Sequence, residues 1–371
     1  MENKGQSKDV WTAEWQNLSP VSEIQMWDFF GLRPWILKYT PREGKVLEAG
    51  CGLGRYVFYL SQMGIDIEGL DFSEETIQFL NNWKKENGFD DVVFKTGDVL
   101  ELPYDDNSLS GYLSFGVIEH FIEGPHKALN EAYRSLRPGG IAVISTPSVS
   151  FNIKLRWAKK GIKNLIKKII FYPIKKPQFF QYWFGAKTLK KHVEQSGLRV
   201  TRADNADLLF AFLEFHKFNK EKIKPGTFAW WLAKTFENTP LRKLGAQSIT
   251  IAVKTAENMH CFVCGNKEAT MNSLEEYDVP ICSNCHESSL AYFYKKGNKV
   301  KFDGTYNFEP PLNVGIGLTC DFCNQEYTTS EIFENYGFSQ NVCPECLKDK
   351  KINIKASNKY INPIWRSRNS K

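Results

Sequence analysis

A glycine-rich turn after a short apolar strand constrains this chain most strongly. Residues 45–49 read Lys-Val-Leu-Glu-Ala, and Gly50, Gly52 and Gly54 follow at alternate positions. Because glycine has no Cβ atom, such a turn lets a ligand approach the backbone at the carboxyl end of a sheet. The pattern therefore predicts a strand, a turn and a helix that together bind a small cofactor.

The acidic residue before the turn narrows the kind of cofactor. Dinucleotide-binding turns have the spacing G-x-G-x-x-G and hold a pyrophosphate at the helix amino end. This chain instead has Glu48-x-Gly50-x-Gly52-x-Gly54. A carboxylate here repels a diphosphate but suits a cationic ligand, such as an amino-acid ammonium or a sulfonium. The segment resembles motif I of the class I S-adenosylmethionine-dependent methyltransferases; a structural glycine turn is the alternative.

Two further predicted strands, at residues 65–70 and 92–95, end in positions that resemble the next motifs of this family. These positions are Asp71, Phe72, Gly97, Asp98 and Val99. The resemblance implies that Asp71 accepts both ribose hydroxyls, that Phe72 packs on the adenine and that Asp98 accepts from the adenine amino group. Alternatively, each aspartate is a helix N-cap or a turn residue.

The next segment completes the resemblance, which covers about residues 30–146. A fourth predicted strand leads to Glu119 and His120, as at the active-site entrance of the subgroup that includes quinone and natural-product methyltransferases. A helix from Leu129, closed by Pro138-Gly139-Gly140, precedes a buried strand at 141–145. The implied cofactor-binding residues are Glu48, Gly50, Cys51, Gly52, Gly54, Asp71, Phe72, Asp98, Val99 and Phe115.

His120 is the predicted general base, and Glu119 is predicted to orient it or to contact the cofactor. A sulfonium methyl is already electrophilic, so the protein must align the nucleophile and, for a hydroxyl, remove its proton. An imidazole titrates near neutral pH and suits this task. The alternative is that His120 caps the next helix or lines the pocket. Some related quinone methyltransferases hold a metal here with two glutamates and a histidine, but Gly116 replaces one of those glutamates.

Eight of the nine cysteines form four C-x2-C units, the spacing that lets two thiolates from one turn reach a tetrahedral metal. The pairs are Cys261 with Cys264, Cys282 with Cys285, Cys320 with Cys323, and Cys343 with Cys346. Their similarity indicates a duplicated zinc-ribbon or treble-clef unit with sequential pairing. Two structural zinc ions are expected, because four thiolates leave no position for water. Disulfides and rubredoxin-like iron are alternatives; the amino terminus resembles no export signal.

The connection from Phe151 to Phe184 is longer than such connections usually are, and in this family it covers the substrate. Its residues 154–170 mix basic with aliphatic and aromatic residues at roughly helical spacing. A helix of this kind binds an anionic membrane surface or a phosphorylated substrate, although an ordinary lid helix with a solvated lysine face looks similar.

These patterns predict a doubly wound, seven-stranded α/β sheet, completed by strands at 198–201 and 248–254. The predicted divisions are cap helices at 1–40, a methyltransferase domain at 41–256 with a lid at 147–185, zinc modules at 257–290 and 316–350, and a basic tail at 351–371. The 371 residues and formal charge of +6 fit a multidomain chain. No apolar run is long enough to span a membrane, so a cytoplasmic protein is expected, with peripheral contact at the inner face of a membrane through the lid.

The expected reaction is methyl transfer to an oxygen of a small molecule or of a lipid- or nucleotide-linked glycan intermediate. Glu48, Asp71 and Asp98 favour catalysis over a non-catalytic binding protein on the same fold. A protein or RNA substrate recognised through the zinc modules is the main alternative, although the spacers between the cysteine pairs are acidic rather than basic.

Overall fold

The computed structural model describes most of the chain up to residue 287. The described parts are residues 31–41, 43–62, 64–149, 158–159, 179–208, 211, 235–236, 239–262 and 264–287, together with Trp11, Pro20, Glu23 and four short strands near the carboxyl end. These four strands are β8 (Gly317–Thr319), β9 (Glu326–Thr328), β10 (Phe333–Glu334) and β11 (Asn341–Val342). Antiparallel pairs join β8 to β9 and β10 to β11.

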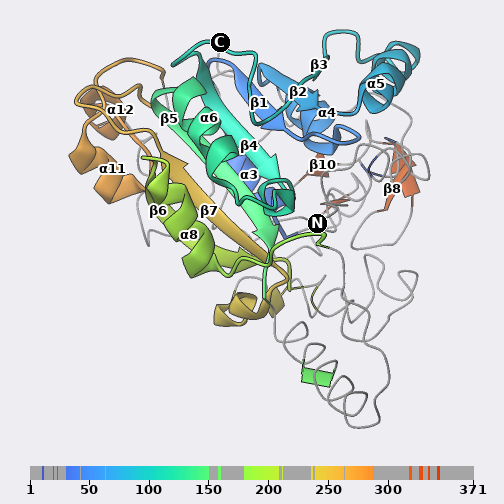
Figure 1. The fold of residues 1–371 in the computed structure, drawn as a ribbon. Coiled ribbons are helices and arrows are strands. Elements are labelled where there is room, and N and C mark those ends of the chain that lie inside the picture. Colours follow the sequence, from blue (N-terminus) through green and yellow to red (C-terminus); the bar gives the residue numbers. More distant parts are fainter. Residues whose placement is uncertain are drawn as a thin grey trace.

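A seven-stranded sheet in the order β3-β2-β1-β4-β5-β7-β6 forms the centre of the molecule (Figure 1). Its strands are β1 (Val46–Ala49), β2 (Ile67–Asp71), β3 (Val93–Thr96), β4 (Leu109–Phe115), β5 (Leu136–Pro147), β6 (Arg199–Ala206) and β7 (Gln247–Val253). All neighbouring pairs are parallel except those made by β7, which runs antiparallel to β5 and β6. Central parallel strands are covered on both faces and therefore read as apolar runs, which is why the sequence revealed them.

Helices cover both faces of the sheet, as a doubly wound fold requires. One hydrophobic cluster joins residues of α3 (Arg33–Tyr39), α4 (Arg55–Gln62) and α5 (Glu74–Glu86) to the sheet. The other joins α6 (His126–Ser135) and α8 (Ala186–Gln195) to the opposite face. The predicted seven-stranded α/β architecture is confirmed. The short helices are η3 (Ile118–His120), η5 (Pro240–Leu244), α11 (Met271–Tyr277) and α12 (Ser283–Glu287).

The start of β5 differs from the prediction. The segment Pro138-Gly139-Gly140 does not close the preceding helix, which ends at Ser135, but belongs to β5. The register with β4 shifts there, because Leu109 pairs with Leu136 whereas Gly111 pairs with Ile141. Gly139 has a φ of +80°, a conformation that lets the strand accommodate the extra residues as a bulge.

Within the described residues, no helix is long and apolar enough to cross a membrane. Most of the predicted lid lies outside these residues, so its basic amphipathic helix stays a prediction.

Candidate functional site

A cavity of about 410 Å³ opens at the carboxyl ends of the central strands. Its size falls in the range of pockets that hold small molecules. Among its lining residues are most of the predicted cofactor-binding residues, namely Glu48, Gly50, Cys51, Gly52, Asp71, Phe72, Asp98, Val99 and Phe115. His120 also lines it, whereas Gly54 and Glu119 do not.

The glycine turn between β1 and α4 has the geometry that only glycine adopts easily. Gly50, Gly52 and Gly54 have φ values of +78°, +52° and +75°. A Cβ atom on Gly50 would lie 2.4 Å from Cγ2 of Val117, which lines the cavity. A Cβ atom on Gly54 would instead lie 2.6 Å from the Phe94 ring, so Gly54 serves packing beneath the turn.

Asp71 joins the glycine turn to the end of β2. Its Oδ2 accepts a hydrogen bond from the backbone N–H of Gly52 at 2.9 Å, and its Oδ1 accepts one from Ser73 at 3.1 Å. Burial raises the pKa of this carboxyl, while these backbone donors lower it. Each carboxylate oxygen has a further lone pair, so Asp71 can still accept hydroxyl groups from a ligand in the cavity.

Glu48 places a buried carboxyl group in the cavity wall. Its side chain is only 3% exposed, and Oε2 has no hydrogen-bond partner among the described residues. Burial raises the pKa of Glu48 well above its usual value, and the nearby Arg55 lowers it. A buried carboxyl without a donor is costly, and a ligand in the cavity that donated to this oxygen would remove that cost. A ligand ammonium would do so.

Asp98 and Val99 lie on the loop after β3. The Oδ1 atom of Asp98 accepts from the backbone N–H of Leu100 at 2.8 Å, and its side chain is exposed. Asp98 therefore makes the turn contact of the alternative interpretation and also lines the cavity. Val99 is buried and supplies an apolar wall.

His120 lines the same cavity from η3, after β4. Its Nδ1 lies 3.0 Å from the carbonyl oxygen of Phe180. A carbonyl only accepts hydrogen bonds, so Nδ1 is the protonated nitrogen and Nε2 carries the lone pair in the neutral ring. Burial lowers the pKa of His120, which keeps the ring neutral and basic at Nε2. The ring of Trp11 contacts it edge-on, with centroids 4.9 Å apart.

Glu119 lies beside His120 and is not among the residues that line the cavity. Its Oε1 is 3.8 Å from Nε2 of His120, and neither carboxyl oxygen has a hydrogen-bond partner among the described residues. Burial raises the pKa of Glu119 to about 8, so the group is mostly protonated at neutral pH. The described geometry places Glu119 beside the histidine, and its contact with the cofactor stays a prediction.

Several lining residues escaped the sequence reasoning. They include Trp11, Glu23, Leu32, Leu53, Arg55, Tyr56, Leu100, Gly116, Val117, Phe121, Ser145 and Gln247. Arg55, which pairs with Glu23, directly follows the glycine turn and could have been found by position. Ser145 lies two residues before the end of β5, and Gln247 begins β7; no local pattern distinguishes them from other polar residues near strand ends.

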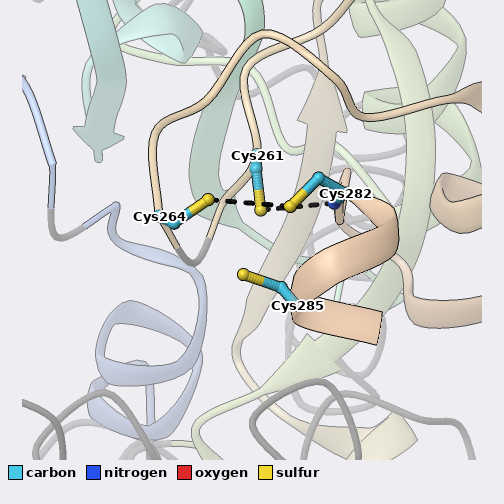
Figure 2. A group of neighbouring side chains, drawn as sticks. All are labelled: Cys261, Cys264, Cys282 and Cys285. Atoms are coloured by element: carbon cyan, nitrogen blue, oxygen red, sulfur yellow. Dashed lines mark hydrogen bonds between the residues drawn. The ribbon is translucent and has the colours of Figure 1, made fainter. Parts of the chain in front are cut away.

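The amino-terminal set of four cysteines forms a candidate metal site (Figure 2). Its candidate ligands, Cys261, Cys264, Cys282 and Cys285, bring their Sγ atoms within 4.8 Å of one another. A tetrahedral zinc ion with bonds of about 2.3 Å places sulfur atoms about 3.8 Å apart, so the set fits such an ion. The Sγ atoms of Cys264 and Cys282 are 3.6 Å apart, well beyond the ~2.05 Å of a disulfide.

The four sulfur atoms come from a knuckle before α11 and from the start of α12. This arrangement is the sequential pairing for the first set. The second set, Cys320, Cys323, Cys343 and Cys346, lies outside the described residues, so its zinc ion stays a prediction.

Comparison with known proteins places a methyltransferase domain on the same residues. Residues 47–144 match the family model described as a methyltransferase domain. A Mycolicibacterium smegmatis protein named as a probable S-adenosylmethionine-dependent methyltransferase is 34% identical over 103 residues, covering 28% of this chain and 38% of that protein. The norajmaline N-methyltransferase of Rauvolfia serpentina is 30% identical over 127 residues, covering 33% of this chain and 43% of the enzyme.

The aligned part thus spans less than half of the length of these relatives. Among solved structures, a chain from a complex between the Haloferax volcanii Trm112 methyltransferase activator and a putative methyltransferase is 19% identical. It covers 69% of this chain and 100% of that one, with a TM-score of 0.44. The domain match, the sheet order and the carboxyl groups at the strand ends together support a class I S-adenosylmethionine-dependent methyltransferase domain in this chain.

Proposed function

We propose that the protein transfers the methyl group of S-adenosylmethionine to an oxygen atom of a small molecule or of a lipid- or nucleotide-linked glycan intermediate. The buried carboxyl group of Glu48 carries this proposal, because Glu48 lines the cavity and its Oε2 has no donor among the described residues. The methionine ammonium of the cofactor supplies the missing donor. Asp71 then accepts the ribose hydroxyls, and Phe72, Asp98 and Val99 surround the adenine.

His120 is the proposed base for the acceptor. The carbonyl of Phe180 holds the proton on Nδ1, so Nε2 can accept the proton of an acceptor hydroxyl as its oxygen attacks the methyl group. A positive charge on the ring would favour the ionised form of Glu119, whose Oε1 lies 3.8 Å from Nε2. Glu119 is therefore a positioning residue, and the proton transfer takes place at His120.

The composition of the cavity wall supports a small acceptor. Apolar and aromatic side chains line the cavity together with His120, including Trp11, Phe115 and Phe121, and Ser145 and Gln247 add two polar side chains. Pockets of this composition suit small molecules with few hydrogen-bonding groups. The relative named for norajmaline also acts on a small molecule.

Two zinc ions complete the proposal, one in each set of four cysteines. The described set supports it with four sulfur atoms at tetrahedral spacing. Four thiolates close the coordination sphere, so zinc there has a structural role and takes no part in methyl transfer.

Methyl transfer can be tested with S-adenosylmethionine that carries a tritiated methyl group. The enzyme is incubated separately with the dialysable small-molecule fraction, the lipid fraction and the macromolecular fraction of an extract from the source organism. The proposal predicts enzyme-dependent label in the small-molecule or lipid fraction. Label confined to protein or RNA would instead identify a macromolecular acceptor.

A matched pair of histidine variants tests the role of His120. His120→Ala should lose at least about 100-fold in transfer rate, the lower range for general base catalysis, while binding the cofactor product S-adenosylhomocysteine. His126→Ala is the control, because His126 is exposed and does not line the cavity. Equal transfer rates in the two variants would contradict the proposed base.

A further inference from the structure

We infer that metal binding at Cys261, Cys264, Cys282 and Cys285 stabilises the methyltransferase domain itself and, through α3, its cofactor cavity. The inference rests on the proposed zinc binding. It assigns the first cysteine module, residues 257–287, an integral place in the catalytic fold, in contrast to a separately folded recognition module.

The first cysteine module shares a hydrophobic core with the sheet. One cluster of buried residues contains Ile36 and Tyr39 of α3, Ile141 of β5 and Val253 of β7. The same cluster includes the module residues Met259, Cys261, Phe262, Ala269, Leu274, Val279, Ile281, Cys282 and Cys285. Two of the candidate ligands, Cys261 and Cys282, are at most 1% exposed. A module that folded apart from the sheet would leave both of these surfaces open to water.

Backbone contacts join the module to the bulge in β5. The N–H of His260, next to the first candidate ligand, donates to the carbonyl of Pro138 at 3.1 Å. A Cβ atom on Gly139 would lie 2.6 Å from the carbonyl oxygen of His260. The two backbones are therefore in direct contact, which gives the unexpected early start of β5 a reason.

Charged side chains link the module to β6, the strand at the edge of the sheet. Arg202 donates to Asp278 at 2.8 Å, and Arg199 pairs with Glu275 at 2.9 Å. Asp278 ends α11 in the left-handed conformation, with a φ of +66°. Lys38 of α3 lies near the first of these pairs. Burial and the charge of Arg202 together lower the pKa of Lys38 to about 8, against the opposing effect of Asp278.

The helix α3 extends from this contact to the cavity. Leu32, its N-cap, lines the cavity, while Ile36 and Tyr39 are buried in the shared core. A shift of the module would therefore change the packing beneath α3 and the position of Leu32. This is the physical route by which metal loss weakens cofactor binding.

The short helices of the module depend on contacts outside themselves for their stability. α11 has 7 residues and α12 has 5, whereas isolated helices below roughly 12–15 residues are marginal in water. In small cysteine modules the binding energy of zinc supplies the folding energy. Because this module shares its hydrophobic core with the sheet, zinc binding would also stabilise the sheet.

The test uses the full chain, purified with its metal, and the variants Cys285→Ser and Ser283→Ala. Ser283 is exposed on the same helix and is not a ligand, so it serves as the matched control. Zinc content is measured by mass spectrometry, thermal unfolding by calorimetry, and S-adenosylhomocysteine affinity by titration. Cys285→Ser should lose one zinc per chain and lower the main unfolding midpoint by about 10 °C, the scale set by loss of a tightly bound ligand. Its S-adenosylhomocysteine affinity should fall several-fold.

Hydrogen exchange of the unmodified chain, with and without a zinc chelator, covers the case in which Cys285→Ser does not fold. Chelation should increase exchange in α3, β6 and residues 257–287 more than in α5. Increased exchange confined to residues 257–287, or an unchanged main midpoint after zinc loss, would overturn the inference, as would metal-free reduced protein. If the unmodified chain binds no S-adenosylhomocysteine, the proposed function fails, while the midpoint and the exchange data still decide this inference.

Discussion

The substitution Gly50→Ala tests the geometry of the glycine turn. Gly50 has a φ of +78°, which costs a residue with a Cβ atom about 1–2 kcal/mol. The new Cβ atom would also lie 2.4 Å from Cγ2 of Val117, and such overpacking typically costs about 1–3 kcal/mol. Together these effects predict a loss of about 2–5 kcal/mol in the free energy of unfolding.

Gly88→Ala is the matched control. Gly88 has a similar φ of +76°, but a Cβ atom there meets nothing within 4 Å. It should lose only the conformational part, about 1–2 kcal/mol. Urea unfolding of both variants gives the difference, and calorimetry gives the affinity for S-adenosylhomocysteine. Only Gly50→Ala should weaken binding, because Gly50 and Val117 both line the cavity. Equal stabilities and unchanged binding in both variants would refute the reasoning.

Three further predictions concern ionisable groups. Burial raises the pKa of Glu119 from 4.5 to about 8. Between these two pH values the folded protein holds a proton that the unfolded chain has lost. The free energy of unfolding should therefore fall as the pH rises from 4.5 to 8 and then level off. Urea unfolding across this range should show a weaker slope for Glu119→Gln, and an identical slope would contradict the assignment. Arg202→Ala should lower the free energy of unfolding by about 1–3 kcal/mol, because it removes the ion-pair partner of the mostly buried Asp278. Arg199→Ala breaks a more exposed pair and should cost less than about 1 kcal/mol. Equal urea midpoints for the two variants would contradict the larger cost for Arg202→Ala. Asp71→Ala should weaken S-adenosylhomocysteine binding by about tenfold or more in calorimetry, because it removes a buried hydrogen-bond acceptor. The control Asp66→Ala changes an exposed residue and should bind like the unmodified chain. Similar affinities of the two variants would exclude Asp71 from the site.

The sequence predicted the central sheet well because its signals are local. Buried parallel strands read as apolar runs, and the acidic and glycine residues at their carboxyl ends mark the cavity. Glu48 and Asp71 could therefore be selected from the residue pattern alone. The second zinc set and the lid stay predictions, since their residues lie outside the described parts.

Other features depend on contacts between distant segments and left no local pattern. Ser145 and Gln247 reach the cavity through the antiparallel pairing of β5 with β7, and Leu32 reaches it through the packing of α3. The early start of β5 comes with the pairing of Leu136 with Leu109, and the close approach of His260 to Gly139 likewise joins residues far apart in sequence. Gly54 has a positive φ like Gly50 and Gly52, but the space beside its Cα is filled by the Phe94 ring. The spacing of the glycines does not show which of them face the cavity and which face the core.

The central claim is that the cavity at the ends of β1, β2 and β4 binds S-adenosylmethionine. Calorimetric titration of the full chain with S-adenosylmethionine tests it most directly. The account predicts one site per chain with a dissociation constant in the micromolar range, and a clear loss of affinity in Glu48→Gln. The absence of binding at millimolar ligand, or equal affinity in Glu48→Gln, would contradict it.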